Sequence, residues 1–221
     1  MLGIFRLKRD SSSYIAICKG IFPLPVVMNL NTASKSRLST RISAHLNSSK
    51  FRNPETMPRA ISKFITHHPW SVNHVAGSDE VSLQNTVDAR AIDIRWSIIP
   101  VIGDNFSPLP QPGIPFTISV SDKLTPQGIV FRCRTRKTSS YRYAIERVGC
   151  YTSFPERDSL TSYAGPHFAT LESELQMAFD EVLHAWGMNT EVVDFIEASS
   201  QYYNNLEYIN WLCNINDFIS K

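Results

Sequence analysis

Histidine and carboxylate side chains are the first candidates for chemistry in this sequence. Glu181 and His184 form a Glu-x-x-His pair on a predicted helix, the unit that binds iron when a helical bundle supplies two copies. The chain has one copy, so we interpret the pair as part of a helix surface. His67, His68 and His74 lack the spaced cysteines or clustered carboxylates of a metal site, and we assign them to a solvated loop. The sequence therefore predicts no metal-binding residues.

Motifs of catalysis and phosphate binding are absent from the sequence. It contains no Walker or dinucleotide-binding glycine loop, no G-x-S-x-G elbow and no H-E-x-x-H motif. The cysteines (Cys18, Cys133, Cys150 and Cys213) are far apart, which excludes a recognisable zinc ribbon or a disulfide-dense scaffold. Cys133 lies on the apolar face of a predicted strand, so we expect it in the core. We predict that the protein is not an enzyme and has no catalytic residues, no cofactor-binding residues and no cofactor.

One segment has the composition of a nucleic-acid-binding surface, because basic residues alternate along a predicted strand and two tyrosines follow (Arg132, Arg134, Arg136, Lys137, Tyr141 and Tyr143). Arginine neutralises phosphate and tyrosine stacks on bases, so RNA contact through Arg132–Tyr143 is one hypothesis. Two alternatives stay open. The arginines mark the solvent face of a strand, or they pair with acidic residues of the C-terminal helices, within the chain or across a subunit boundary. We predict no DNA specificity.

The charge of the chain is unevenly distributed, although its formal net charge is only +2. Residues 1–53 hold nine Lys or Arg and one acid, Asp10, among many Ser, Thr and Asn residues. A basic, hydroxylated, acid-poor N-terminus is typical of an organelle transit peptide, and a positive leader is drawn towards the negative interior of the mitochondrion. We predict that residues 1–53 are a removed leader and that the protein lies in the mitochondrial matrix, with the plastid second. A disordered basic arm that binds nucleic acid or membrane is the alternative.

Residues 54–221 are predicted to form a single acidic domain. Residues 54–119 carry four basic and six acidic residues (net −2), and residues 120–149 carry seven and two (net +5). Residues 150–221 carry only Arg157 and Lys221 against eleven acids (net −9), a charge that suits capture of basic proteins. No uninterrupted run of about 18 apolar residues exists, so no membrane span is predicted.

Two hydrophobic periods divide this domain. From about residue 81 to 154 the period is two: Ile92, Ile94, Trp96 and Ile98 alternate with polar residues, and later strands follow after short turns. Consecutive strands without intervening helices predict an antiparallel meander. From about residue 168 to 221 the period is that of a helix. We therefore predict an α+β fold.

Three helices are predicted in the C-terminal part. Gly187 is placed to end the first, the second begins at Asn189 or Thr190, and Asn204 caps a third. A short N-terminal helix is predicted over Arg59 to Thr66. Helices therefore flank the meander on both sides in the sequence.

The C-terminal segment resembles the mitochondrial acidic matrix protein family, also called the mitochondrial glycoprotein or complement component 1 Q-binding protein family. About 60 residues carry the resemblance, in the segment YAGPHFATLESELQMAFDEVLHAWGMNTEVVDFIEASSQYYNNLEYINWLCNINDFISK. The matching features are Tyr163, Gly165, Pro166, Phe168, Leu171, Glu174, Leu175, Gln176, the helix end at Gly187, Glu207, Tyr208, Ile209, Trp211, Leu212 and Phe218. Two departures indicate a divergent member: Ile99 to Pro115 is rich in proline with only Asp104 as an acid, and Trp186 stands where the family often has Arg.

The resemblance implies a strongly twisted antiparallel sheet flanked by N- and C-terminal helices, and a ring-shaped trimer, homomeric or mixed with paralogues. It also implies a non-enzymatic, multi-ligand or chaperone-like protein of the mitochondrial matrix. Such a protein supports mitochondrial ribosome assembly, translation and respiratory function. Together with the charge of residues 150–221, it implies basic partners such as mitochondrial ribosomal proteins. An RNA-associated mitochondrial factor is the alternative function.

Overall fold

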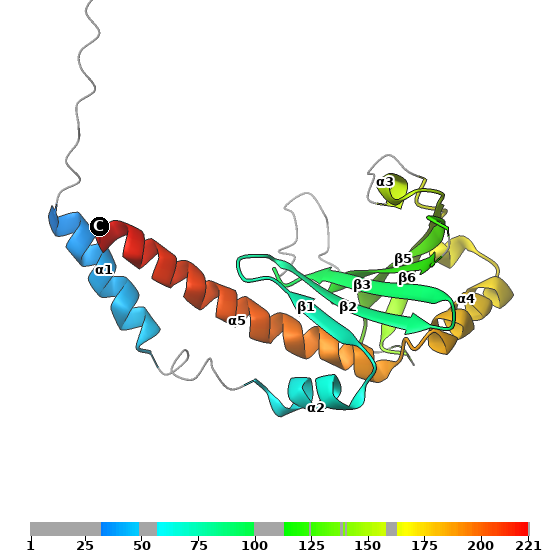
Figure 1. Cartoon of the computed structure of the whole chain (residues 1–221), viewed down its shortest axis with the longest axis horizontal. Coiled ribbons are helices and arrows are strands. Elements are labelled where there is room, and N and C mark those ends of the chain that lie inside the picture. Colours follow the sequence, from blue (N-terminus) through cyan, green and yellow to red (C-terminus); the bar gives the residue numbers. More distant parts are fainter. Residues whose placement is uncertain are drawn as a thin grey trace, which may run out of the picture.

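The computed structural model describes residues 32–48, 57–99, 113–123, 125–137, 139, 141–157 and 163–220. These residues form a sheet with helices on either side of it in the sequence (Figure 1). The helices are α1 (Thr32–Leu46), α2 (Arg59–His67), α3 (Phe154–Arg157), α4 (Ser173–Ala185), α5 (Thr190–Ser220) and the 3₁₀ helix η1 (Phe168–Thr170). The strands are β1 (Ser71–His74), β2 (Glu80–Val87), β3 (Arg90–Ser97), β4 (Pro115–Asp122), β5 (Gly128–Thr135) and β6 (Tyr143–Tyr151).

The sheet is an antiparallel meander in the order β1-β2-β3-β4-β5-β6, so every strand pairs with its neighbours in the sequence. The predicted α+β class, the meander and the helix near Arg59 are confirmed. The predicted start of the sheet at about residue 81 was wrong, because β1 precedes it. This strand has a weak apolar pattern, and its pairing with β2, for example Val72 opposite Leu83, holds it in the sheet.

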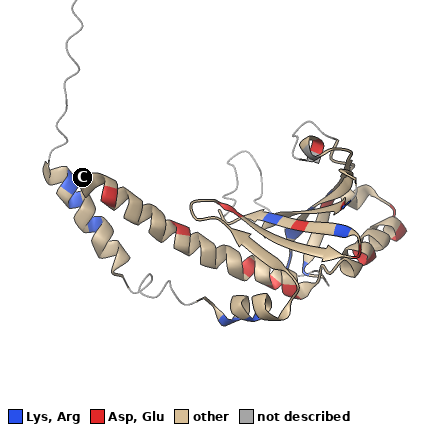
Figure 2. Cartoon of the chain, viewed as in Figure 1, with Lys and Arg blue, Asp and Glu red and all other residues tan. Residues whose placement is uncertain are grey.

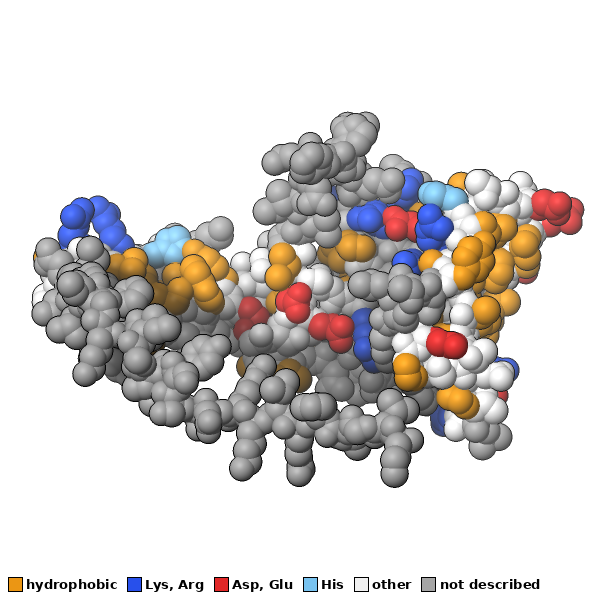
Figure 3. All heavy atoms as spheres, turned by 90° about the horizontal axis from the view of Figure 1, so that it is seen from above, with side chains coloured by type: hydrophobic (Ala, Val, Ile, Leu, Met, Phe, Trp, Pro, Cys, Tyr) orange, Lys and Arg blue, Asp and Glu red, His pale blue; other side chains and the backbone are white. Residues whose placement is uncertain are grey.

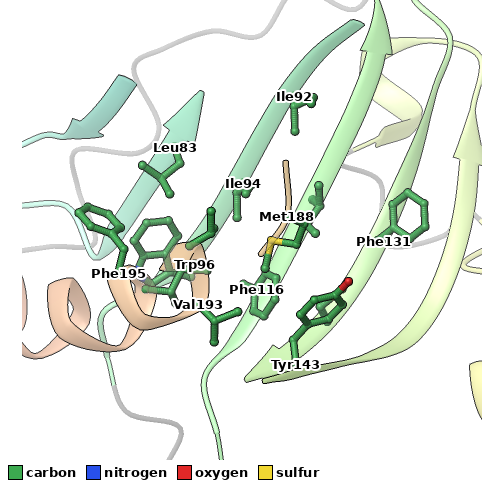
Figure 4. Close-up of a cluster of buried hydrophobic side chains, with 14 of the residues drawn as sticks. Leu83, Ile92, Ile94, Trp96, Phe116, Phe131, Tyr143, Met188, Val193 and Phe195 are labelled. Carbon is green, nitrogen blue, oxygen red and sulfur yellow. The ribbon is translucent and has the colours of Figure 1, made fainter. Parts of the chain in front are cut away.

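Apolar side chains of one sheet face form the core with α2, α4 and α5. Ile94, Trp96 and Phe116 point from the sheet towards Val193 and Phe195 of α5 (Figure 4). The aromatic ring of Phe195 also stacks on Phe64 of α2, with ring centroids 4.4 Å apart. Leu183 of α4 is 1% exposed, and Cys133 lies in the core, as predicted. This burial supplies the hydrophobic stabilisation that fixes the helices on the sheet.

The connection between α4 and α5 follows from two residues. Gly187 has φ +91°, and the Met188 N–H donates to the Leu183 carbonyl oxygen, which is the hydrogen bond of a glycine-ended helix. Asn189 Oδ1 then accepts the Val192 N–H at 3.0 Å and caps α5. The predicted helix end at Gly187 and the restart beside it are confirmed.

Helix α5 continues without a break for 31 residues, about 46 Å, so the predicted new helix at Asn204 was wrong. Asn204 can cap a helix but also fits inside one at a small cost, and here packing decides between the two. The C-terminal half of α5 extends beyond the sheet and pairs with α1 (Figure 1). We call this pair of helices the arm.

The arm is held by polar and apolar contacts. Ser39 Oγ donates to Asn216 Oδ1 at 2.8 Å, and the Tyr208 hydroxyl lies 3.1 Å from His45 Nε2, so the two helices run antiparallel. Ile42 of α1 is 6% exposed and Leu212 of α5 is 7% exposed. Helix α1 falls inside the segment 1–53 that the sequence analysis assigned to a leader.

Two glycines allow close approaches that a larger residue would prevent. Gly128 lies opposite Tyr151, and a Cβ on it would come within 2.3 Å of the tyrosine oxygen. Gly165 has φ +80°, and a Cβ there would lie 2.0 Å from the Val148 carbonyl oxygen. Its own carbonyl accepts from Arg147 Nη1 at 2.9 Å. Gly165, one of the residues on which the family resemblance rests, therefore lets the chain lie against β6.

Candidate functional site

Helices α4 and α5 present an acidic surface. Neither helix contains Lys or Arg, whereas together they carry eight acids (Glu174, Asp180, Glu181, Glu191, Asp194, Glu197, Glu207 and Asp217). Five of these side chains are exposed (Glu174, Glu181, Glu191, Asp194 and Asp217). The positions of these acids are the red segments of both helices in Figure 2. We call this set of eight acids the acidic layer.

Part of the acidic layer is neutralised by Arg142, which lies at the start of β6. Arg142 Nη1 lies 2.8 Å from Asp194 Oδ1, and Nη2 lies 3.0 Å from Glu197 Oε2. The backbone of Arg142 has φ +61°, a conformation that non-glycine residues adopt at an energetic cost. Arg142 was not among the arginines for which pairing with C-terminal acids was left open, and of those arginines Arg134 pairs instead with Glu146 of β6.

Two histidines contact further acids of α5. His68 Nε2 lies 3.2 Å from Glu191 Oε2, and His74 Nε2 lies 3.7 Å from Glu207 Oε1. The prediction of a solvated loop was wrong for both, and His67 is part of α2. The sequence offered no signal for these pairs, since the partners are more than 120 residues apart. Among the residues with described positions, no group of three His, Cys, Asp or Glu side chains could hold a metal ion.

Glu181 and His184 lie on the surface of α4, as predicted. His184 Nδ1 is 3.2 Å from the Met188 carbonyl oxygen, which ties the end of the helix to the following turn. Trp186, at the position that departs from the family pattern, is half-buried and lies with its ring centroid 6.3 Å from that of Phe131. This tryptophan therefore packs on the sheet of its own chain.

Asp180 faces two buried groups of the sheet. Burial raises the pKa of Asp180 itself. The pKa of the Tyr143 hydroxyl is raised well above its usual range, first by burial and then by the negative charge of Asp180. Burial, followed by the charge of Asp180, also raises the pKa of the Cys133 thiol. Both groups therefore stay protonated at neutral pH, and a buried thiol of this kind is a poor nucleophile.

The basic segment Arg132–Tyr143 does not form one continuous surface. Arg134 Nε pairs with Glu146 Oε1 at 2.7 Å, and Tyr143 is only 3% exposed. The prediction that Tyr143 could stack on a base was therefore wrong, because the ring lies in the core (Figure 4). Arg132, Arg136 and Lys137 are exposed, as predicted for a solvent-facing strand and turn, and Tyr141 is 38% exposed.

The proline-rich segment Ile99 to Pro115, in which the sequence departs from the family pattern, lies mostly outside the described residues. The described helices include none that is long and apolar enough to cross a membrane. Taken together, the fold and the acidic layer define an α+β domain whose prominent surface feature is negative charge on its C-terminal helices.

Comparisons with known proteins agree with this class. A sequence model of the MAM33 family, described as mitochondrial glycoprotein, matches residues 103–219, which is more than half of the chain. The chain therefore belongs to the mitochondrial glycoprotein family, and this family is mitochondrial.

Two solved structures have a similar fold. One is the Trypanosoma brucei p22 protein, with a TM-score of 0.64 and 19% identity over 85% of this chain and 99% of that chain. The other is a Leishmania major protein of unknown function, described as a sequence homologue of human p32, with a TM-score of 0.63 and 14% identity. That match covers 84% of this chain and 99% of the other. At these identities the likeness supports the fold alone, and the fold is p32-like.

Proposed function

We propose that this protein is a non-enzymatic protein of the mitochondrial matrix that assembles with copies of itself and binds basic proteins through its acidic layer. The observation that carries the proposal is the charge of α4 and α5, which have eight acids and no Lys or Arg. Negative charge of this density raises the rate of encounter with basic partners and disfavours acidic ones. Mitochondrial ribosomal proteins have the required chemistry.

A chaperone-like role follows from the same surface. The five exposed acids of the acidic layer are spread over two helices, α4 and α5. Such a surface discriminates by charge more than by shape, so it accepts several basic ligands. We therefore assign the protein a supporting role in mitochondrial ribosome assembly and translation, and through these in respiratory function.

Self-association is supported by two separate groups of exposed apolar side chains. Leu38 and Phe218 lie on the arm and are 47% and 80% exposed. Leu175, Met177 and Val182 lie on α4 and are 46%, 57% and 40% exposed. Figure 3 shows apolar side chains both on the arm and at the opposite end of the molecule.

Two different patches on one subunit favour head-to-tail contacts, which close into a ring when the rotation allows it. We propose a ring of three subunits in which the arm of one chain contacts α4 of the next. The three chains are copies of this protein, or this protein together with paralogues. Phe218→Glu changes the arm and Val182→Glu changes α4, so each variant alone should assemble less well. In a mixture of the two, the unchanged arm of the Val182→Glu chain can still contact the unchanged α4 of the Phe218→Glu chain.

We also propose that a basic leader is removed on import, with the cut before Thr32 so that α1 is kept. Without α1, the C-terminal half of α5 would lose the helix packed on it, and Asn216 would lose its hydrogen bond from Ser39. A chain of residues 54–221 should therefore melt at a lower temperature and aggregate more than a chain of residues 32–221. Equal melting temperatures for the two chains would show that α1 does not stabilise the fold and would remove the argument for a cut before Thr32.

The function is tested by binding of a basic ribosomal protein at low and high salt. Glu174→Gln with Glu181→Gln removes two exposed acids of the acidic layer and should weaken binding at low salt. The matched control removes two exposed acids of the β2 region, by Glu80→Gln and Asp88→Asn, where asparagine tolerates the φ of +53° at residue 88. Equal weakening by both pairs would mean that net charge, and not the acidic layer, determines binding.

The alternative of RNA contact now rests on Arg132, Arg136 and Lys137 with Tyr141. Tyr143 is buried and Arg134 is paired with Glu146, so the segment lacks the continuous basic and aromatic face that single-stranded RNA prefers. We therefore do not propose RNA binding as the main function.

A further inference from the structure

A hollow of about 620 Å³ lies where the arm leaves the sheet. Its walls are the turn between β1 and β2, the chain just after β3, and one face of α5. The polar and aromatic groups that matter are two carboxylates, one tryptophan and three side-chain amides (Asp79, Glu207, Trp211, Asn204, Asn210 and Asn214). A volume of this size admits a long side chain of a partner.

We propose that this hollow binds an arginine side chain of a basic partner. The inference rests on the proposed function and deepens it, because it names the residue type that the partner inserts and the residues that receive it. Charge is the first argument. The described residues that line the hollow include two acids and no Lys or Arg, so a cation entering it meets only attractive charge at the wall.

Glu207 is held in position to receive a cation. Its Oε2 accepts the Gly77 N–H at 2.9 Å, and its Oε1 lies 3.7 Å from His74 Nε2. The side chain of Glu207 is 18% exposed, so it is shielded from bulk water. Each carboxylate oxygen has more than one acceptor site, which leaves capacity for a further donor. A charge-assisted hydrogen bond to such a preoriented carboxylate is stronger than one between neutral groups.

His74, on β1 beside Glu207, is a group that could carry a competing positive charge. Its Nε2 lies 3.2 Å from the Ser78 carbonyl oxygen, and only a protonated nitrogen can donate to that acceptor. The neutral ring meets this requirement in one of its two tautomers, so the contact with Ser78 does not require a charged His74. The His74 side chain is 9% exposed, and its ring packs against Tyr203, with centroids 4.4 Å apart.

Asp79 supplies the second carboxylate from the opposite wall. It lies on the turn before β2, and its Oδ2 is within 3.3 Å of Ser97 Oγ, which can donate to it. Asp79 and Glu207 thus face the hollow from the hairpin and from α5 respectively. A guanidinium group has five N–H donors in a planar fork and can reach more than one acceptor at once.

Trp211 gives the hollow a preference for arginine. The side chain is 55% exposed, and its ring stacks on Tyr208, with centroids 5.8 Å apart and planes 23° apart. Because Trp211 is also exposed and lines the hollow, a cation that enters can lie against its indole ring. Guanidinium stacks on an aromatic face more readily than the strongly hydrated lysine ammonium group, and asparagine amide oxygens add further acceptors.

The test uses the full chain and three otherwise identical nine-residue Gly/Ser peptides that carry three arginines, three lysines or three citrullines. Binding is measured by isothermal titration calorimetry at low salt. We expect the arginine peptide to bind, the lysine peptide to bind several-fold more weakly and the citrulline peptide not to bind. Glu207→Gln and Trp211→Ala should each weaken binding of the arginine peptide at least tenfold.

The matched control is Asp88→Asn, which removes the same charge from an exposed acid just after β2, outside both the hollow and the acidic layer. It should change the affinity less than twofold. Glu207→Gln weakens the contact with the Gly77 N–H and could disturb the hairpin, so Asp79→Asn serves as a second variant in the hollow. Unfolding curves of all variants show whether they fold.

If Asp88→Asn weakens binding as much as the variants in the hollow, or if Trp211→Ala has no effect, the hollow is not the site. The acidic layer can still bind basic proteins in that case. If the wild-type chain binds neither the arginine peptide nor a basic ribosomal protein, the proposed function fails as well.

Discussion

Arg142 links the start of β6 to α5 and offers the sharpest test of the packing between sheet and acidic layer. Its guanidinium contacts Asp194 at 2.8 Å and Glu197 at 3.0 Å. The side chain of Asp194 is 55% exposed, so this pair contributes about 0.5 kcal/mol, as exposed pairs do. The Glu197 side chain is 29% exposed, and a charge-assisted bond to it contributes about 1.5 kcal/mol. Arg142→Ala should therefore lower the free energy of unfolding by about 2 kcal/mol.

The backbone of Arg142 adds a second, independent expectation. Its φ of +61° is unfavourable for any residue with a Cβ, by about 1 kcal/mol, and costs glycine little. Arg142→Gly loses the same two ion pairs but relieves this strain. It should therefore be about 1 kcal/mol more stable than Arg142→Ala, and still less stable than the wild type.

The assay is urea unfolding followed by circular dichroism, at one protein concentration for all variants because self-association shifts apparent stability. The loss in Arg142→Ala should shrink at high salt, since the pairs are partly exposed. An Arg142→Ala variant within 0.5 kcal/mol of the wild type would refute the role of the ion pairs. If the Arg142→Gly variant is no more stable than the Arg142→Ala variant, the argument from backbone strain is refuted.

Two further predictions concern Gly128 and Asp180. A Cβ on Gly128 would clash with the ring end of the buried Tyr151 and lie 2.5 Å from the Val120 backbone carbonyl oxygen, which cannot move aside, so Gly128→Ala should lower the free energy of unfolding by about 2–3 kcal/mol. A Cβ on Gly77 would meet no atom within 4 Å, and only the φ of +85° disfavours it, so Gly77→Ala should lower the free energy of unfolding by about 1 kcal/mol. Similar losses for Gly77→Ala and Gly128→Ala would contradict the argument from close contact. Because the pKa of Asp180 is raised in the folded state, the folded chain binds more protons than the unfolded chain, and this group lowers stability as the pH rises through its folded pKa. Asp180→Asn should therefore have a higher urea midpoint than the wild type at pH 7. This gain should disappear below the ordinary aspartate pKa of about 4. A gain in midpoint that is larger at pH 4 than at pH 7 would contradict the argument.

Much of the fold was predictable because local patterns and tertiary packing agree. The alternation of Ile92, Ile94 and Trp96 with polar residues places one face of β3 in the core, and the structure buries all three. Gly187 ends α4 because its backbone adopts a left-handed conformation, which a glycine after a helical stripe makes easy. The helix at α2 was predictable for a similar reason, since Ile61 and Phe64 lie one turn apart and both are buried.

The remaining features depend on partners distant in the sequence. Helix α1 has the composition of a leader, and only its packing on α5, through Ile42 among other residues, places it in the fold. Strand β1 has little apolar pattern and gains its order from pairing with β2. Asn204 is a good capping residue, yet α5 continues through it.

The candidate site was predictable in its charge but not in its geometry. The net charge of −9 over residues 150–221 indicated an acidic surface, and the absence of Lys and Arg from α4 and α5 accounts for it. Which acids are paired depends on contacts such as Arg142 with Glu197, 55 residues apart. The hollow beside Trp211 is formed by a hairpin turn and a helix more than 120 residues further along the chain, so no local pattern could indicate it.

Light scattering after size exclusion, on residues 32–221 with and without a basic mitochondrial ribosomal protein, tests the central claim most directly. We predict a mass of three chains that increases when the ribosomal protein is added at low salt, with the added mass lost at high salt. A monomer that binds no basic protein at low salt would contradict both the assembly and the acidic capture that we propose.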